Sequence, residues 1–139
     1  MDWAPRNPDF ETVVRSSFAQ QGMMALLAAE IEAVEPGRVC ITAPIRPEVG
    51  QQHGFAHAGL AWTIGDSAAG YSAMSLLAAG AEVLTVEMKI NLLAPARAAR
   101  LIARGRVIRP GRRLIVVGSE ITADDGTAVA TMLGTMIVA

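Results

Sequence analysis

The chain has 139 residues, 52% of them hydrophobic, and a formal net charge of −1. This length and composition favour a single domain, residues 1–139, with a substantial core, and they exclude an intrinsically disordered chain. The near-neutral charge gives no reason to expect nucleic acid or an anionic membrane as a partner.

The first half of the chain predicts a helix, two strands and a second helix. Residues 8–21 have apolar side chains near helical spacing, and residues 23–34 and 38–45 are typical of two strands around the turn at 35–37. Residues 58–79 predict the second helix, ended by Gly80. Its many glycines and alanines favour close wrapping by a curved sheet, since each interior glycine otherwise costs about 1 kcal/mol relative to alanine.

The second half predicts four strands, at residues 83–93, 100–108, 114–123 and 128–138. In the first of these, the alternation places Leu84 and Val86 on one face and Thr85 on the other, away from the helix unless a bulge or a sheet edge brings it round. Short turns between the strands imply a largely antiparallel sheet. The fold class is therefore α+β rather than a doubly wound α/β fold.

The number of cysteines and the length of the apolar runs indicate the cellular compartment of the protein. Cys40 is the only cysteine, so no internal disulfide can form and a reducing compartment is expected. We expect it to lie in the 38–45 strand as a small buried hydrophobic residue rather than a nucleophile. No apolar signal core and no run of transmembrane length is found, which predicts a cytoplasmic protein without membrane contact.

Asp66 is the first candidate for chemistry, because it is a lone carboxylate within a helix of small and apolar residues. Such a group is unfavourable to bury unless it is paired or used. The same helix starts just after a polar, glycine-containing loop, so its free N–H groups can hold a carbonyl oxygen that gains negative charge. These features indicate an acyl-transfer or hydrolytic site with Asp66 as general base or nucleophile, and the sequence does not choose between these roles.

Two motifs together carry a family resemblance. His57, Gly59 and Asp66 form H-x-G followed by an aspartate, and the run TVEMKINLLAPA follows at residues 85–96. In this order and spacing they resemble the hotdog-fold acyl-CoA thioesterases of the phenylacetate-degradation (PaaI-like) type, over residues 22–138. The resemblance implies an antiparallel sheet wrapped around one central helix, with a short N-terminal helix, and an enzyme that hydrolyses acyl-CoA without a metal or other cofactor.

The resemblance also implies roles for individual residues. Gln51 matches a position where relatives carry an amide that orients water or the thioester, although the adjacent Gln52 leaves an ambiguity of one residue. His57 is expected to fix the loop. Where many relatives have His-Gly-Gly this chain has Ala58, whose N–H serves as an oxyanion donor with that of Gly59 only if its backbone is not left-handed. Thr85 matches a position whose hydroxyl bonds the water or the carboxylate.

A cluster of arginines surrounds the hairpin that turns at Pro110-Gly111. Their guanidinium groups could dock coenzyme A phosphates, with a solvated hairpin rim as the alternative. The residues expected to do so are Arg109, Arg112 and Arg113, within a wider group of Arg97, Arg100, Arg104 and Arg106.

Other functions stay open beside the thioesterase. One is a hotdog-fold dehydratase or hydratase, in which the catalytic histidine would precede a Pro-Gly pair; here His57 precedes Ala-Gly. Another is a non-catalytic acyl-binding protein. Residues 70–74 lack the last glycine of a nucleophile elbow, and His53 and His57 lack the glutamate of a zincin motif, so no metal site is expected.

The spacing within the helix predicts an oligomer. Asp66 lies about 12 Å along the helix from Ala58, at 1.5 Å per residue. A reacting carbonyl must be within about 3 Å of both its oxyanion donor and the attacking group. We therefore expect a homodimer with shared sites, and the family resemblance further implies a dimer of dimers. Asp66 and Thr85 would come from one chain, and Gln51, His57, Ala58 and Gly59 from the other.

Overall fold

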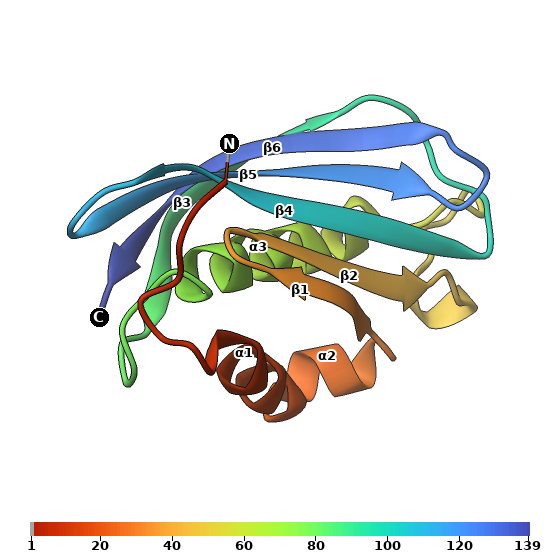
Figure 1. The fold of residues 1–139 in the computed structure, drawn as a ribbon. Helices are drawn as coiled ribbons and strands as arrows, with labels where there is room; N and C mark the ends of the chain where they lie inside the picture. The colour runs from red at the N-terminus through yellow and green to blue at the C-terminus, as the bar shows by residue number, and fades with distance from the viewer. Residues whose placement is uncertain (1) are drawn as a thin grey trace.

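A six-stranded sheet curved around one helix makes up most of the computed structural model, which describes residues 2–139. Figure 1 shows α3 in the hollow of the sheet, with α1 and α2 on the far side of β1. The elements are α1 (Phe10–Ala19), α2 (Gly22–Leu26), β1 (Glu30–Glu35), β2 (Arg38–Pro44), the 3-10 turn η1 (Pro47–Val49), α3 (Ala58–Met74), β3 (Val83–Leu92), β4 (Arg100–Pro110), β5 (Leu114–Ala123) and β6 (Ala128–Val138).

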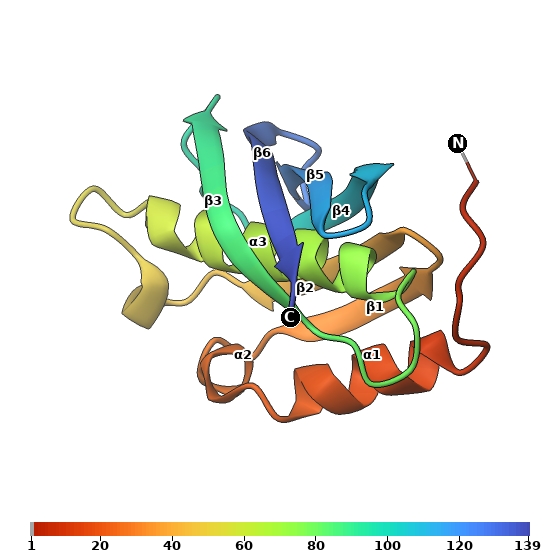
Figure 2. The ribbon, with the colours of Figure 1, turned by 90° about the vertical axis from the view of Figure 1, so that its left-hand side faces the viewer.

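The strands lie in the order β1-β2-β4-β5-β6-β3, and every neighbouring pair is antiparallel. The predicted α+β class, with an antiparallel sheet around a central helix and a short N-terminal helix, is confirmed. In Figure 2 β3 stands beside β6 at the margin of the sheet, with no strand on its outer side. This edge position matters for the site, because Thr85 belongs to β3.

Small residues let α3 approach the sheet closely, as its composition predicts. A Cβ atom on Gly105 of β4 would collide with the backbone of Ala68, and one on Gly65 would collide with the sulfur of Met132. The remaining core is aliphatic, with Ile64 of α3 and Leu101 of β4 fully buried. The backbone of α3 is therefore held rigidly against the sheet, and with it the position of Asp66.

Two predicted boundaries in the first half are wrong. The expected strand at 23–34 begins only at Glu30, because residues 22–26 form α2; methionine, alanine and leucine are good helix formers and this segment has no β-branched residue. The second predicted helix ends at Met74 instead of Ala79. There the Ser75 hydroxyl donates to the Ser72 carbonyl and accepts the Gly37 N–H, which ties the end of the helix to the β1–β2 turn.

The predicted faces of β3 are correct only for its second half. The register with β6 shifts between Thr85 and Glu87, so a bulge reverses the alternation there. Met88 and Ile90 pack on the core as expected, but Leu84 and Val86 are 63% and 56% exposed. The bulge turns Thr85 toward α3. A bulge was one of the two features, with a sheet edge, that the sequence analysis required for Thr85 to reach the site.

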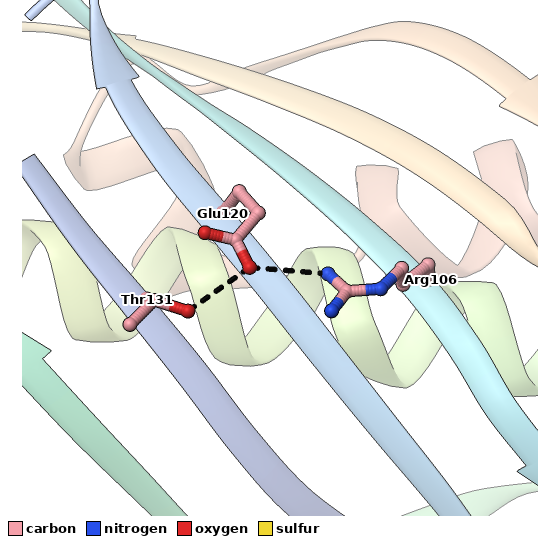
Figure 3. A network of polar contacts seen from close by, with 3 residues as sticks. All are labelled: Arg106, Glu120 and Thr131. Atoms are coloured by element: carbon pink, nitrogen blue, oxygen red, sulfur yellow. Dashed lines mark hydrogen bonds and ion pairs between the residues drawn. The ribbon is translucent and has the colours of Figure 1, made fainter. Parts of the chain in front are cut away.

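The outer face of the sheet, away from α3, is polar. Arg106 of β4 contacts Glu120 of β5 at 3.3 Å, and Thr131 of β6 donates to the same carboxylate oxygen at 2.9 Å (Figure 3). Cys40 lies in β2 as predicted but on this outer face, so it is only partly buried, and the expectation of a buried residue is wrong. Burial and the nearby Glu32 carboxylate raise the pKa of the Cys40 thiol to about 11, which disfavours the thiolate.

Candidate active site

The predicted site residues fall into two groups at different places along α3. Asp66 and Thr85 line one cavity, of about 210 Å³, near the middle of the helix. Gln51, His57 and Ala58 line another, of about 470 Å³, at the start of the helix. The two cavities share no lining residue. Within one chain the structure brings each group together, and it keeps the two groups apart.

Asp66 is held by the edge strand. The Thr85 hydroxyl donates to Asp66 Oδ1 at 2.8 Å, across the bulge that turns Thr85 inward. Within residues 2–139 no hydrogen bond engages Asp66 Oδ2. The carboxylate is thus fixed by one oxygen and has the other available for a water molecule or a carbonyl carbon.

Two effects act on the pKa of Asp66 in opposite directions. Burial raises the pKa of this carboxyl above its usual value, and the hydrogen bond from Thr85 partly offsets that rise. Burial is the larger effect. A carboxylate with a raised pKa is a stronger base than an exposed aspartate, as a group that takes a proton from water requires.

His57 caps the start of α3. Its backbone is extended, and its Nδ1 accepts the Gly59 N–H at 2.8 Å. Because Nδ1 accepts, the neutral ring carries its proton on Nε2. His57 N–H also donates to the Val49 carbonyl at 2.9 Å. The side chain therefore fixes the helix start and the backbone N–H fixes the loop, while the role of His57 in the site stays a prediction.

Of the two predicted oxyanion donors, only the Ala58 N–H is available in the structure to bind a substrate oxygen. The Gly59 N–H is occupied by His57, whereas no hydrogen bond from the Ala58 N–H is found within residues 2–139. The only non-glycine residue there with positive φ is Ala28, so Ala58 is not left-handed. The alanine that replaces the second glycine of the motif is thus compatible with a donor at this position.

Gln51 and Gln52 line the same cavity but differ in how they are held. Gln51 Oε1 accepts the backbone N–H groups of His53 and Phe55, while the Gln52 side chain is exposed and makes no hydrogen bond within residues 2–139. Because the loop donors occupy its oxygen, Gln51 has its NH₂ group left to donate. A fixed amide donor suits a carbonyl oxygen, which favours Gln51 over Gln52.

The arginines around the β4–β5 hairpin differ in their contacts. Arg97 donates to the His53 carbonyl at 3.0 Å and lies 4.7 Å from the centre of the Phe55 ring, so it braces the 51–56 loop. Arg104 and Arg106 bond to Thr122 and Glu120 on the outer face. The exposed residues Arg109, Arg112 and Arg113 occupy the β4–β5 hairpin, at the end of the sheet where β3 begins and opposite the 51–57 loop (Figure 1).

Comparisons with known proteins identify the family. The model of the thioesterase superfamily matches residues 53–130, more than half of the chain, and includes both groups of site residues except Gln51. The chain belongs to the thioesterase superfamily. A thioesterase family protein from Silicibacter pomeroyi is 45% identical over 93% of this chain and 97% of its own, with a TM-score of 0.90.

Other relatives agree with this assignment. A protein of Saccharolobus solfataricus, named as a proposed esterase, is 30% identical over 81% of this chain and 79% of its own. The Escherichia coli PaaI protein of the phenylacetic acid degradation operon, at 20% identity, shares the fold with a TM-score of 0.86 over 95% of this chain and 94% of its own. The hotdog fold and the class of thioester hydrolase, both implied by the sequence motifs, are confirmed.

Three residues of the Asp66 cavity in this thioesterase were missed by sequence analysis. Ser17 and Gln21 come from α1 and the turn after it, and Tyr71 comes from α3. Nothing in their spacing marks them, because they meet only when α1 packs on the second half of α3. Within residues 2–139, no three histidine, cysteine, aspartate or glutamate side chains gather to hold a metal ion, and no helix is long and apolar enough to cross a membrane.

Proposed function

We infer that this thioesterase hydrolyses acyl-CoA thioesters and that Asp66 is its catalytic carboxylate. The observation that carries this is a partly buried carboxylate with one oxygen held by Thr85 and the other free, in a cavity on the central helix of a thioesterase fold. Asp66 Oδ2 accepts a proton from the attacking water, or attacks the thioester carbonyl itself. The carbonyl oxygen takes up negative charge and is met by the Ala58 N–H and the Gln51 amide. Collapse of the tetrahedral intermediate breaks the C–S bond, and CoA leaves as the thiol with the proton lost by water; on the nucleophilic route water then hydrolyses the acyl-Asp66 anhydride.

Each site is formed by two copies of the chain. One copy separates Ala58 from Asp66 by about 12 Å along α3, at 1.5 Å per residue, so it does not supply both to one carbonyl. The open edge of β3, with the exposed Leu84 and Val86, is a surface that a single copy leaves in water. Two-fold pairing of β3 with β3 of a second copy buries these side chains and brings the two α3 helices together in opposite directions.

The arginine hairpin is the proposed contact for the phosphates of coenzyme A. Arg109, Arg112 and Arg113 are exposed and lie at the end of the sheet near the start of β3, whereas Arg104 and Arg106 have partners on the outer face. Guanidinium groups bind phosphate oxygens in a bidentate manner. No metal or other cofactor takes part in this proposal, and the proposed site of action is the cytoplasm.

A panel of acyl-CoA thioesters with detection of free thiol tests the proposed function. Hydrolysis of at least one ester at rates well above the background supports it, and no release of thiol from any ester contradicts it. Single turnover in ¹⁸O-labelled water then separates the two roles of Asp66. Label in the Asp66 side chain shows an acyl-aspartate anhydride and hence a nucleophile. Label in the released acid alone, together with no acyl hydroxamate when hydroxylamine is present to trap an anhydride, indicates a general base.

A further inference from the structure

The cavity beside Asp66 has a polar wall that the hydrolytic chemistry does not use. Its lining residues come from α3 between Asp66 and Met74, from α1 and the turn after it, and from the start of β3. Tyr71, only 5% exposed, contributes its hydroxyl to this wall, together with Ser17 and Gln21. A polar wall opposite a reactive carboxylate indicates a subsite that recognises part of the substrate.

The hydrogen bonds within this wall show which donors and acceptors remain for a ligand. Gln21 Nε2 donates to Tyr71 Oη at 2.7 Å, and Ser17 Oγ lies 3.1 Å from the same oxygen. One hydroxyl proton makes the bond between Ser17 and Tyr71, so the second hydroxyl proton of the pair has no acceptor within residues 2–139. Gln21 Oε1 has no donor there either. The cluster therefore has one donor and one acceptor available.

The charges that line the cavity restrict the charge of the acyl group that it can bind. Its lining includes two carboxylates, Asp66 and Glu82, and no cationic side chain from residues 2–139. An acyl group that ends in a carboxylate would be repelled by both. Met74, Val83 and Met136 supply apolar contact for methylene groups between the two polar ends.

The size of the cavity favours a short acyl group. Its volume of about 210 Å³ is below the range of roughly 300–1,000 Å³ typical of sites for drug-sized ligands. Tyr71 follows Asp66 by five residues, about 7.5 Å along the helix at 1.5 Å per residue. A chain of a few carbons spans that distance.

We propose that this cavity is the acyl subsite, and that it selects short, uncharged acyl groups with a hydroxyl or ketone oxygen at the far end. The wall of Ser17, Gln21 and Tyr71 donates to that oxygen and, where the oxygen is a hydroxyl, also accepts its proton, while the carbonyl carbon lies at Asp66. The proposal rests on the proposed function, because it uses Asp66 as the point where the thioester is attacked.

Matched thioesters of one chain length test the subsite. The set is hexanoyl-CoA, its ω-hydroxy analogue, its analogue with a ketone next to the terminal methyl, and the ω-carboxylated adipoyl-CoA. The kcat/KM values for the hydroxy and keto esters should exceed that for hexanoyl-CoA by about tenfold, since the partly buried wall loses water on binding and pairs only with an oxygenated acyl group. Adipoyl-CoA should be the poorest substrate. A preference for hexanoyl-CoA over both oxygenated esters would overturn the proposal.

Variants then assign the preference to the wall. In the double variant Ser17→Ala, Gln21→Met, the kcat/KM for ω-hydroxyhexanoyl-CoA divided by that for hexanoyl-CoA should fall to about one. Tyr71→Phe should lower this ratio as well. Gln20→Met is the matched control, because Gln20 is exposed on the same turn and lies outside the cavity lining; it should keep the wild-type ratio. An unchanged ratio in the double variant would contradict the assignment.

A binding measurement keeps this test separate from that of the proposed function. Calorimetry with the stable thioethers S-hexyl-CoA and S-(ω-hydroxyhexyl)-CoA needs no turnover. The hydroxylated thioether should bind more tightly to the wild type and equally to the Ser17→Ala, Gln21→Met variant. Equal Kd values in the wild type would overturn the subsite even if thioesters are hydrolysed. If no ester is hydrolysed, the proposed function fails while the Kd values still decide the subsite.

Discussion

The two groups of site residues along α3 differ in what they offer to a substrate. At the middle of the helix, Asp66 is partly buried, has a raised pKa and keeps one oxygen free. At the start of the helix, the loop is more exposed and uses most of its polar atoms internally, as Gly59 N–H and Gln51 Oε1 show. In the proposed mechanism one end supplies a reactive charge and the other supplies a few donors, so each needs the other for hydrolysis.

Removing the reactive charge should have the largest effect. Asp66→Asn keeps the shape but removes the base or nucleophile, so kcat should fall by roughly 10²- to 10⁴-fold. Hydrolysis of every active acyl-CoA at a near wild-type rate would show that Asp66 is not catalytic.

The same variant should stabilise the protein at neutral pH. Because burial raises the pKa of Asp66 in the folded state, the ionised carboxylate opposes folding above that pKa, and the penalty vanishes as the pH falls below the unfolded value of about 3.9. The Tm of Asp66→Asn should therefore exceed that of the wild type by a few degrees at pH of about 7, and the gap should close in acid. A lower Tm at neutral pH would contradict the burial of this charge.

In the loop at the start of α3, substitution of Gln51 should lower kcat the most. Gln51→Ala removes an amide donor toward the carbonyl oxygen and loosens the loop, so kcat should fall by about 10²-fold. Gln52→Ala is the matched control and should change kcat by less than about threefold, since its side chain is exposed and unbonded within residues 2–139. A larger loss in Gln52→Ala would assign the role to the neighbouring residue.

Thr85→Val should shift the pH profile more than the rate. The hydrogen bond from Thr85 lowers the pKa of Asp66, so its removal raises that pKa further. Activity needs ionised Asp66; the acidic limb of kcat should therefore move to higher pH, with a loss of only a few-fold on the plateau. Thr135→Val, which removes a hydroxyl bonded to Glu87 on β3, should leave the limb in place. An unmoved limb in Thr85→Val would mean that this hydroxyl does not act on Asp66.

The smallest effect is expected at the hairpin, which lies outside both groups. Arg109→Ala with Arg112→Ala should raise KM for acyl-CoA several-fold with little change in kcat, because remote phosphate contacts act equally in the ground and transition states. The same ester of pantetheine, which lacks the nucleotide, should show no change in KM. Equal changes for both esters would show that the hairpin does not bind the nucleotide.

The sequence predicted the parts of the site that depend on local pattern. Asp66 within a small-residue helix follows from the pattern along one element, and the strands of the second half follow from their alternation, whereas His57 came from the motif of the family resemblance. Thr85 shows the limit of this approach, because a bulge at one residue reversed the expected face of Leu84 and Val86. The residues of α1 that meet Tyr71 could not be found at all, since their approach depends on tertiary packing.

The central claim is that each site takes Asp66 from one chain and Gln51 with His57 from another. The direct measurement mixes an inactive Asp66→Ala variant with an inactive Gln51→Ala variant and allows subunits to exchange. Each heterodimer then has one site with both substitutions and one with neither, so activity should return toward about a quarter of the wild-type value if exchange is statistical. No recovery after exchange has been demonstrated would contradict the claim and place the whole site within one chain.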